Sequence, residues 1–285
     1  MKILFLPVIF FSVSSLHAQY YYNDIIATAE TNQQMQTWVA NKVKMITATG
    51  FDANGVKASD FAEVKEIKDN GRTLKVTTRN SGDYSAYYNR YDEKGRLIST
   101  SDSTSSLVIN SITYEYNTAG RIIQVKTILS DPSGGFEKKE VHSWLYNAAG
   151  MPEKMWRIVN NTDSLEIRFV PDEKGNPGEE IVYKWGAESS RIYYYFDETG
   201  RVSDIVRFNE KVKKLLPDMI FTYDDAGRII QKITSTPGEN YGWVTWVGYF
   251  IWRYIYNDKG LKTKEALFDK EQHLTGKIEY SYNFQ

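Results

Sequence analysis

Alternating apolar and polar residues recur in short runs along residues 84–285, and each run is interrupted by a polar stretch that contains a glycine. The clearest unit is residues 221–229, where Phe221 and Tyr223 precede Asp224 and Gly227 follows it. Side chains two positions apart in a strand point to one face of a sheet. The pattern therefore predicts a strand that buries its aromatic residues and ends in a tight turn at the glycine.

Seven copies of this unit follow one another. Asp or Asn stands three positions before the glycine in every copy, and an aromatic residue stands four positions before it in all but one, which has Pro171. Asp or Asn can accept a hydrogen bond from the backbone two residues on, and glycine adopts a positive φ without strain. Each copy therefore predicts a β-hairpin closed by a type I turn with a left-handed residue. The seven glycines are Gly95, Gly120, Gly150, Gly175, Gly200, Gly227 and Gly260.

The glycines are 25 to 33 residues apart, which is the signature of a repeat architecture. We expect an all-β repeat fold, an extended and twisted antiparallel sheet of stacked β-hairpins over residues 51–285 with an N-terminal capping helix. Residues 51–83 predict a degenerate first hairpin that turns at Asn70 and Gly71. Residues 280–283 repeat the first half of the unit and predict a closing edge strand.

Three of the copies resemble the YD-repeat, or RHS-like, family: residues 91–97, 116–122 and 223–229. The resemblance covers residues 84–285. It implies hairpins in a long spiralling sheet, which in the large members of the family closes into a shell around a toxin domain. Seven copies are too few for such a shell, and we expect no separate domain after the last copy. A toxin-carrier role is therefore not inferred.

The N-terminus predicts export. Residues 1–18 have the pattern of a signal peptide, with Lys2, an apolar core over residues 3–13 and a cleavage site after Ala18. A membrane anchor is the alternative, but the apolar run is too short to span a bilayer. We therefore expect a periplasmic, secreted or surface-associated protein.

Residues 24–48 predict a helix, within an N-terminal helical cap of residues 19–50. Thr31 and Gln34 fit a capping box, and the apolar residues from Met35 onward recur at helical spacing. Repeat arrays need their ends covered, so we expect this helix to cover the first edge or the open end of the sheet. The alternative is a helix that binds a partner.

Composition and motifs give no case for catalysis. The net charge of −1 offers no electrostatic reason to bind nucleic acid, and the absence of cysteine removes disulfides and thiol chemistry. His142 and His273 have no motif around them, and the Asp and Asn residues of the turns lack the spacing of a calcium loop. We expect no enzyme, no metal site and no cofactor.

The longest spacing contains residues 241–252, which hold three of the seven tryptophans. Exposed aromatic residues are common in recognition surfaces. The candidate binding residues are Tyr241, Trp243, Trp246 and Trp252. Trp246 and Trp252 share the strand phase of the core aromatics, whereas Trp243 has the opposite phase.

The sequence thus predicts an exported, non-enzymatic repeat scaffold or binding protein of the cell envelope or extracellular space, with a protein or a glycan as its partner. One alternative is a glycan-binding module that uses exposed aromatics. A lesser alternative is an outer-membrane β-barrel, which requires an apolar face on every strand. Asp204 and Arg207 place charges on both faces of one predicted strand and argue against it.

Overall fold

The computed structural model describes residues 20–80, 82–102, 109–210, 212–241 and 244–284, with backbone only over 236–241 and 244–247. These residues form one helix, α1 (Asn23–Ala40), a short 3-10 turn at Asp69–Gly71, and an 18-stranded sheet. The strands are β1 (Val43–Asp52), β2 (Lys57–Lys68), β3 (Thr73–Asn80), β4 (Asp83–Tyr91), β5 (Leu97–Asp102), β6 (Ile109–Tyr116), β7 (Ile122–Ser130), β8 (Glu137–Tyr146), β9 (Pro152–Val159), β10 (Asp163–Pro171), β11 (Pro177–Lys184), β12 (Ala187–Phe196), β13 (Val202–Asn209), β14 (Lys214–Tyr223), β15 (Ile229–Tyr241), β16 (Val244–Tyr256), β17 (Lys262–Phe268) and β18 (Leu274–Phe284).

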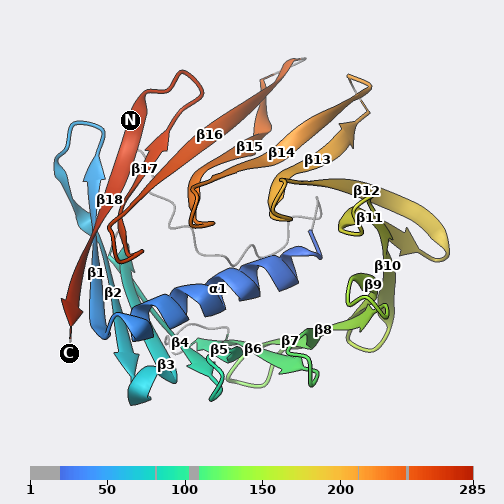
Figure 1. The fold of residues 1–285 in the computed structure, drawn as a ribbon, viewed down its shortest axis with the longest axis horizontal. Coiled ribbons are helices and arrows are strands. Elements are labelled where there is room, and N and C mark those ends of the chain that lie inside the picture. The colour runs from blue at the N-terminus through green and yellow to red at the C-terminus, as the bar shows by residue number, and fades with distance from the viewer. Residues whose placement is uncertain (1–19, 81, 103–108, 211, 242–243, 285) are drawn as a thin grey trace.

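Each strand pairs in antiparallel fashion with its neighbours in the chain, so the predicted sheet of stacked hairpins is confirmed. The sheet also closes into a barrel, because β18 pairs with β1 as well as with β17 (Figure 1). Ile46 of β1 lies opposite Tyr282 of β18. The predicted closing edge strand is therefore not an edge, and closure removes the unpaired backbone groups that an open sheet would expose.

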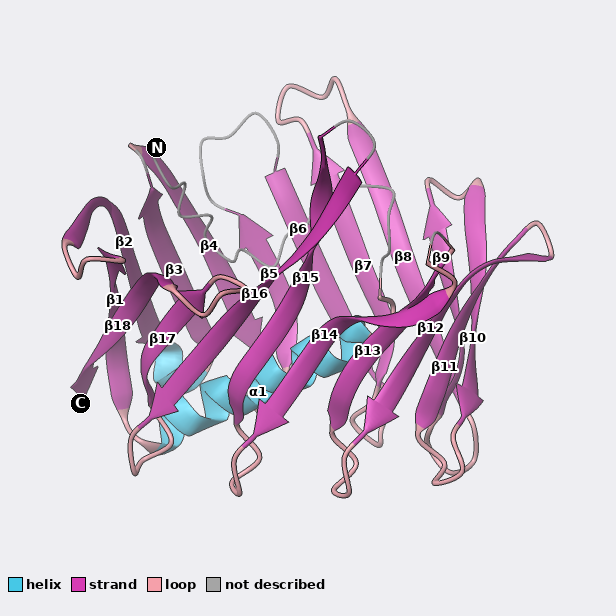
Figure 2. Cartoon of the chain, turned by 90° about the horizontal axis from the view of Figure 1, so that it is seen from above, coloured by secondary structure: helices cyan, strands magenta, loops and turns pink. Residues whose placement is uncertain are grey.

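The turns have the predicted conformation. Gly95, Gly120, Gly200 and Gly227 have φ values of 72°, 79°, 80° and 79°. In the turn at Gly227, Asp224 Oδ1 accepts hydrogen bonds from the backbone N–H groups of Ala226 and Arg228, at 3.1 and 2.9 Å. The repeat turns lie together at one end of the barrel (Figure 2).

Each repeat is fastened to the next through its tyrosine and arginine. The Tyr223 hydroxyl donates a hydrogen bond of 2.7 Å to the carbonyl oxygen of Val202 in the preceding repeat. The Arg201 guanidinium lies over the Tyr223 ring, 4.5 Å from its centroid, and forms an ion pair of 2.7 Å with Asp197. The same hydroxyl bond is made by Tyr116, Tyr146, Tyr256 and Tyr282. The motif therefore specifies contacts between repeats as well as the turn.

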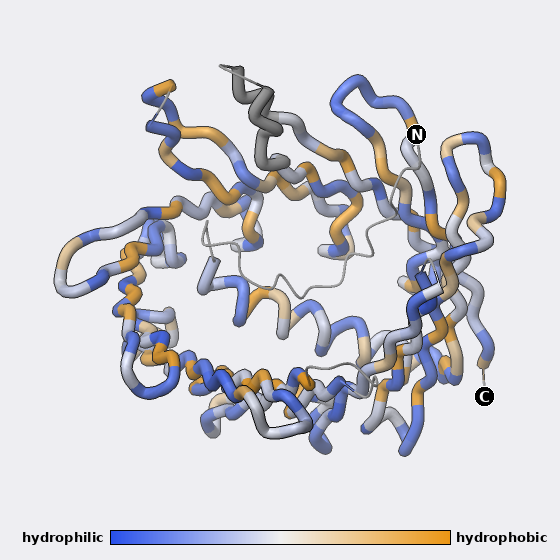
Figure 3. Tube along the Cα trace, turned by 180° about the vertical axis from the view of Figure 1, so that it is seen from behind, coloured by the Kyte–Doolittle hydropathy of each residue, from blue (hydrophilic) through white to orange (hydrophobic). Residues whose placement is uncertain are grey.

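Hydrophobic and hydrophilic residues alternate along the barrel wall (Figure 3). The repeat aromatics face the interior, where they pack in clusters with Tyr21 and Tyr22 before the helix. Trp144 and Tyr194 are buried. Other aromatics at the strand positions of the motif are half-buried: Tyr114, Tyr116, Phe221, Tyr223 and Tyr254. The aromatics therefore lie on the inward face, as predicted, but the helix covers some of them more completely than others.

The helix is shorter than predicted and starts earlier. It begins at Asn23, and Thr31 is not a cap but a mid-helix residue whose hydroxyl donates to the Ala27 carbonyl. The predicted helix over 24–48 is wrong beyond Ala40, since Val43 onward forms β1. The β-branched residues of 43–49 favour a strand, and pairing with both β2 and β18 fixes them there.

The helix lies inside the ring of strands, beside the end that carries the repeat turns (Figures 1 and 2). Met35 and Trp38 are buried in one hydrophobic cluster with residues of β1, β3 and β5. Tyr21 and Tyr22, which precede the helix, pack in two further clusters with buried residues of β7 to β13. Asn32 Oδ1 accepts a hydrogen bond of 2.8 Å from Leu97 N–H on β5. The helix and the segment before it are therefore part of the core, as well as a cover for one end.

Candidate functional site

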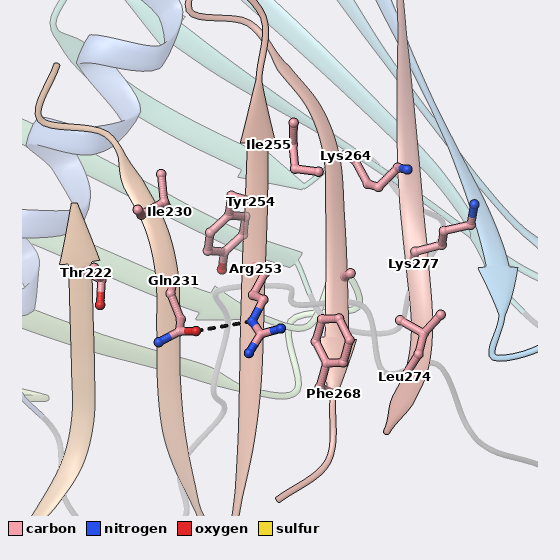
Figure 4. Close-up of a pocket in the computed structure, with 11 residues that line it drawn as sticks. Thr222, Ile230, Gln231, Arg253, Tyr254, Ile255, Lys264, Phe268, Leu274 and Lys277 are labelled. Atoms are coloured by element: carbon pink, nitrogen blue, oxygen red, sulfur yellow. Dashed lines mark hydrogen bonds between the residues drawn. The ribbon is translucent and has the colours of Figure 1, made fainter. Parts of the chain in front are cut away.

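A shallow groove of about 560 Å³ lies on the outer face of β14 to β18 (Figure 4). Its position follows from the alternation of side chains along β16. Tyr254 and Tyr256 point inward, so Arg253, which precedes them, and Ile255, which lies between them, point outward. The register places Arg253 opposite Ala266, and Ala266 opposite Lys277. Ile255 is 54% exposed. The apolar part of the groove consists of Ile230, Ile255, Ala266, Phe268 and Leu274.

Three cations border this groove: Arg253, Lys264 and Lys277, and no carboxylate is among the residues that line it. Lys264 and Lys277 share the single carboxylate of Glu279, at 3.7 and 2.6 Å. The hydrogen bond from Lys277 holds the pKa of Glu279 below its usual range, so this carboxylate stays ionised. One carboxylate for two lysines leaves a net positive charge.

Arg253 adds to this charge, because the groups that it contacts are neutral. Its guanidinium donates to the side-chain oxygens of Gln231 and Gln272, at 3.2 and 3.3 Å. It also lies over the Phe268 ring, 4.7 Å from the centroid. The arginine is thus held in a defined position against an aromatic face, and none of the carboxylates among the described residues forms an ion pair with it.

Elsewhere the outer face of the barrel carries opposite charges next to each other. Glu166 on β10 pairs with Arg168 on the same strand and with Lys154 on β9, at 2.5 and 3.8 Å. Arg191 on β12 pairs with Glu179 on β11 and with Glu188, at 2.5 and 2.9 Å. The groove differs from these surfaces in its apolar floor and its excess of positive charge.

A second candidate lies inside the barrel, where the first turn of the helix meets the wall. His142 on β8 is buried, with Nδ1 2.6 Å from Asp24 Oδ2 and Nε2 3.0 Å from Glu140 Oε1. Arg157 on β9 donates a hydrogen bond of 2.8 Å to Glu140 Oε2. The ring of Tyr21 stands edge-on to His142, with centroids 5.5 Å apart.

The charges of this cluster are coupled. Burial lowers the pKa of His142, but the carboxylates of Asp24 and Glu140 outweigh it and raise the pKa to about 9. Burial raises the pKa of Glu140, but His142 and Arg157 outweigh it and lower the pKa to about 2. At neutral pH the imidazolium therefore donates a hydrogen bond from each nitrogen to a carboxylate. With both nitrogens engaged, His142 has no free position for a substrate, and the cluster attaches the helix to the wall.

Glu180 on β11 holds the segment before the helix. Its fully buried carboxylate accepts hydrogen bonds from the backbone N–H groups of Tyr21 and Tyr22, at 3.1 and 2.8 Å, and from the Tyr194 hydroxyl, at 2.8 Å. Burial raises its pKa to about 7, against the opposing effect of these hydrogen bonds. A carboxylate placed here caps the start of the helix from the barrel wall.

The sequence did not reveal this interior cluster. His142 has the strand phase of the core aromatics, and that is the only signal for its burial. Its partner Asp24 is 118 residues away, and a separation of this length has no short-range pattern. Across the described residues there is no cluster of acidic or histidine side chains suited to a metal ion. In the same part of the chain, no helix is long and apolar enough to cross a membrane.

The predicted binding residues are only partly within the described structure. Trp243 lies outside it, and Tyr241 and Trp246 are described as backbone at the ends of β15 and β16. Trp252 is half-buried and opposite Lys232 and Leu267, in the inward phase of Tyr254. The groove uses the same strand, β16, but its outward-facing residues.

No protein-family model and no curated protein matches the chain. Among solved structures, it is similar to the crystal structure of TcdB2-TccC3-Cdc42, at 15% identity and a TM-score of 0.35, over 79% of this chain and 12% of that one. It is also similar to a porin-like protein from Bacteroides uniformis, at 8% identity and a TM-score of 0.36, over 85% and 98% of the two chains. A porin-like protein from Bacteroides vulgatus is similar at 11% identity and a TM-score of 0.21, over 85% and 98%. These low scores carry no functional argument.

Proposed function

We propose that this protein is an exported, non-enzymatic binding scaffold that presents the groove on β14 to β18 to a protein partner. The observation that carries the proposal is the exposed apolar floor with its uncompensated positive border. Contiguous apolar surface bordered by polar groups marks interaction sites on soluble proteins. The barrel and its internal helix supply a rigid support for that surface.

The charge of the groove indicates the chemistry of the partner. Arg253, Lys264 and Lys277 would pair with carboxylates, and the floor around Ala266 would pack against apolar side chains. The partner is therefore a segment that combines Asp or Glu with apolar residues. Complementary charge raises the association rate and excludes basic competitors, while the apolar contacts supply most of the affinity.

A closed barrel also fits the alternative of an outer-membrane β-barrel. A barrel in a bilayer needs an apolar band on its outer face. Lys154, Glu166 and Arg168 project from adjoining strands into that face, which favours an aqueous surrounding. Dependence of the purified protein on detergent, with heat-modifiable migration in gels, would support the membrane alternative instead.

A peptide selection tests the proposal. The mature chain is immobilised and screened against a phage-displayed library of random peptides, with counter-selection on the Ala266→Trp variant, whose indole fills the groove. We expect the enriched peptides to contain acidic residues next to apolar ones. Enrichment of basic peptides, or of none, contradicts the proposal, and glycan-array binding by the same preparation would favour the glycan-binding alternative.

A further inference from the structure

The hairpin between β11 and β12 ends in an unusual residue. Trp185 occupies the first position of the two-residue turn, with a φ of 51°, and Gly186 follows with a φ of 81°. Lys184 and Ala187 pair on either side of the turn. Trp185 is 91% exposed, so its indole contributes almost nothing to the core. A bulky residue at positive φ is also strained. Folding therefore disfavours tryptophan at this position both because its backbone is strained and because its side chain is not buried.

Other turns of the same chain show what this conformation normally selects. Asp69 and Asn70 have φ values of 52° and 54°, and Asn160 and Asn161 have values of 50° and 60°. Asp and Asn tolerate the left-handed region because their short polar side chains bond locally. Lys42, Lys213 and Gln272 also have positive φ values, of 56°, 53° and 64°, but Trp185 is the only aromatic residue with a positive φ among the described residues. Local departures of this kind concentrate at functional sites.

The neighbouring hairpin, β13–β14, presents similar side chains at the same end of the barrel. The register of β12 with β13 places Ile192 opposite Arg207, so both hairpin tips lie beyond those residues in the same direction. Val212 is 53% exposed, and Phe208 and Leu215 are also exposed. The β11–β12 hairpin projects away from the barrel body (Figure 1).

Lysines accompany these apolar side chains. The ammonium of Lys184 lies 4.7 Å from the centroid of the Trp185 ring. Lys213 and Lys214 directly follow Val212 in the next hairpin, where Lys213 forms an ion pair of 2.5 Å with Glu210. Tryptophan with neighbouring lysine is the pairing that anchors proteins at the boundary between water and acyl chains, where the ring is half in each phase and the ammonium meets a phosphate.

We propose that the tip of the β11–β12 hairpin, together with the exposed side chains of Phe208, Val212 and Leu215 on the neighbouring hairpin, inserts into the surface of a phospholipid bilayer, with Trp185 as the main anchor. The apolar groups sit on separate convex tips rather than in one contiguous patch. A bilayer accepts such tips individually, whereas a protein hot spot is a cluster surrounded by contacts that exclude water. Lys184 and Lys214 add attraction to anionic headgroups. The proposal is independent of the groove, whose three cations lie on β16, β17 and β18.

Vesicle flotation tests this inference with the full mature chain. The probes are vesicles of phosphatidylcholine with and without phosphatidylglycerol, and the variants are Trp185→Asn, Trp185→Phe and Tyr195→Ala. We expect the parent to float with the anionic vesicles and Trp185→Asn to lose roughly tenfold or more in partitioning, because the indole contact is removed. Trp185→Phe should retain most of the binding. Tyr195 is an exposed aromatic toward the other end of β12, so its removal should change nothing.

The asparagine variant also separates binding from folding. Asn suits the left-handed position, so Trp185→Asn should raise the melting temperature while it abolishes flotation. A merely structural tryptophan would lower the melting temperature when replaced. Failure of the parent to float with either vesicle, or equal flotation of the parent and Trp185→Asn, overturns the proposal. Either result would favour binding of Trp185 in a pocket of a partner protein.

Discussion

Nδ1 of His142 lies 2.6 Å from Oδ2 of Asp24 and thereby joins the barrel wall to the first turn of the internal helix. Glu180 accepts hydrogen bonds from the two residues before that helix, and Asn32 bonds the backbone of β5 farther along it. The helix is therefore held at several points by polar contacts as well as by Met35 and Trp38. Its attachment is expected to depend on pH.

Asp24→Asn should destabilise the protein most at mildly acidic pH. The pKa of His142 is raised from its ordinary value of 6.5 to about 9, so the stability from its charge is fully present below 6.5 and is lost as pH rises through 9. We expect a loss of about 2 kcal/mol in the free energy of unfolding at pH 6, shrinking above pH 9. Urea titrations across this range measure it, and a constant difference at every pH would contradict the assignment.

Glu180→Gln should remove a pH dependence of the stability at acidic pH, below the range in which His142 titrates. Burial raises the pKa of Glu180 from 4.5 to about 7, so the parent loses stability as pH rises between these values. The glutamine variant should show a flatter profile there. Glu180→Ala leaves the Tyr21 and Tyr22 N–H groups unpaired and should cost about 3 kcal/mol at mildly acidic pH, where the parent is most stable. Parallel profiles for the parent and the glutamine variant would exclude Glu180 as the titrating group.

The contact between repeats can be tested at Tyr223. Removing its hydroxyl in Tyr223→Phe takes away the bond to Val202 and should cost about 1 kcal/mol. Tyr195→Phe, at an exposed ring, is the control and should change stability by less than about 0.5 kcal/mol. A double-mutant cycle of Tyr223→Leu with Arg201→Ala should give a coupling of about 0.5–1 kcal/mol, because Tyr223→Leu removes the ring on which the guanidinium stacks. Zero coupling would mean that the stacking contributes nothing.

Gly120→Ala should cost about 1–2 kcal/mol through backbone strain alone. Its φ is +79°, and an added methyl group would meet only the Arg96 guanidinium, at 3.8 Å, so steric overlap is not the cause. Thermal unfolding measures the loss. A variant as stable as the parent would show that the turn tolerates an ordinary residue.

The repeat turns, the hairpins and the inward aromatic face were predictable because each depends on residues within one repeat. Closure of the barrel was not, because it depends on pairing between β1 and β18, whose register is set by residues more than 200 positions apart. The predicted helix was too long because the apolar residues of 43–48 fit helical spacing as well as the alternation of a strand. Only pairing with the neighbouring strands decides that this segment is a strand.

The candidate site was predicted less well than the fold. The interval 241–252 directed attention to β16, but the groove is built from outward-facing residues of five strands, including Gln231, Arg253 and Lys277. Their convergence depends on strand register and on bulges such as the one between Ile255 and Tyr256. Trp185 was visible in the sequence, yet its significance comes from its positive φ and its exposure, which the residue type alone does not give.

The most direct test of the proposed function is the affinity of a selected acidic, apolar peptide for three forms of the chain, measured by isothermal titration calorimetry. The forms are the parent, Ala266→Trp in the groove, and Ser143→Trp, which places the same side chain on the outer face of β8 far from it. The account predicts at least about tenfold weaker binding for Ala266→Trp, a loss of about 1.4 kcal/mol, and parental binding for Ser143→Trp. Equal affinities for the parent and Ala266→Trp would contradict the groove as the binding surface.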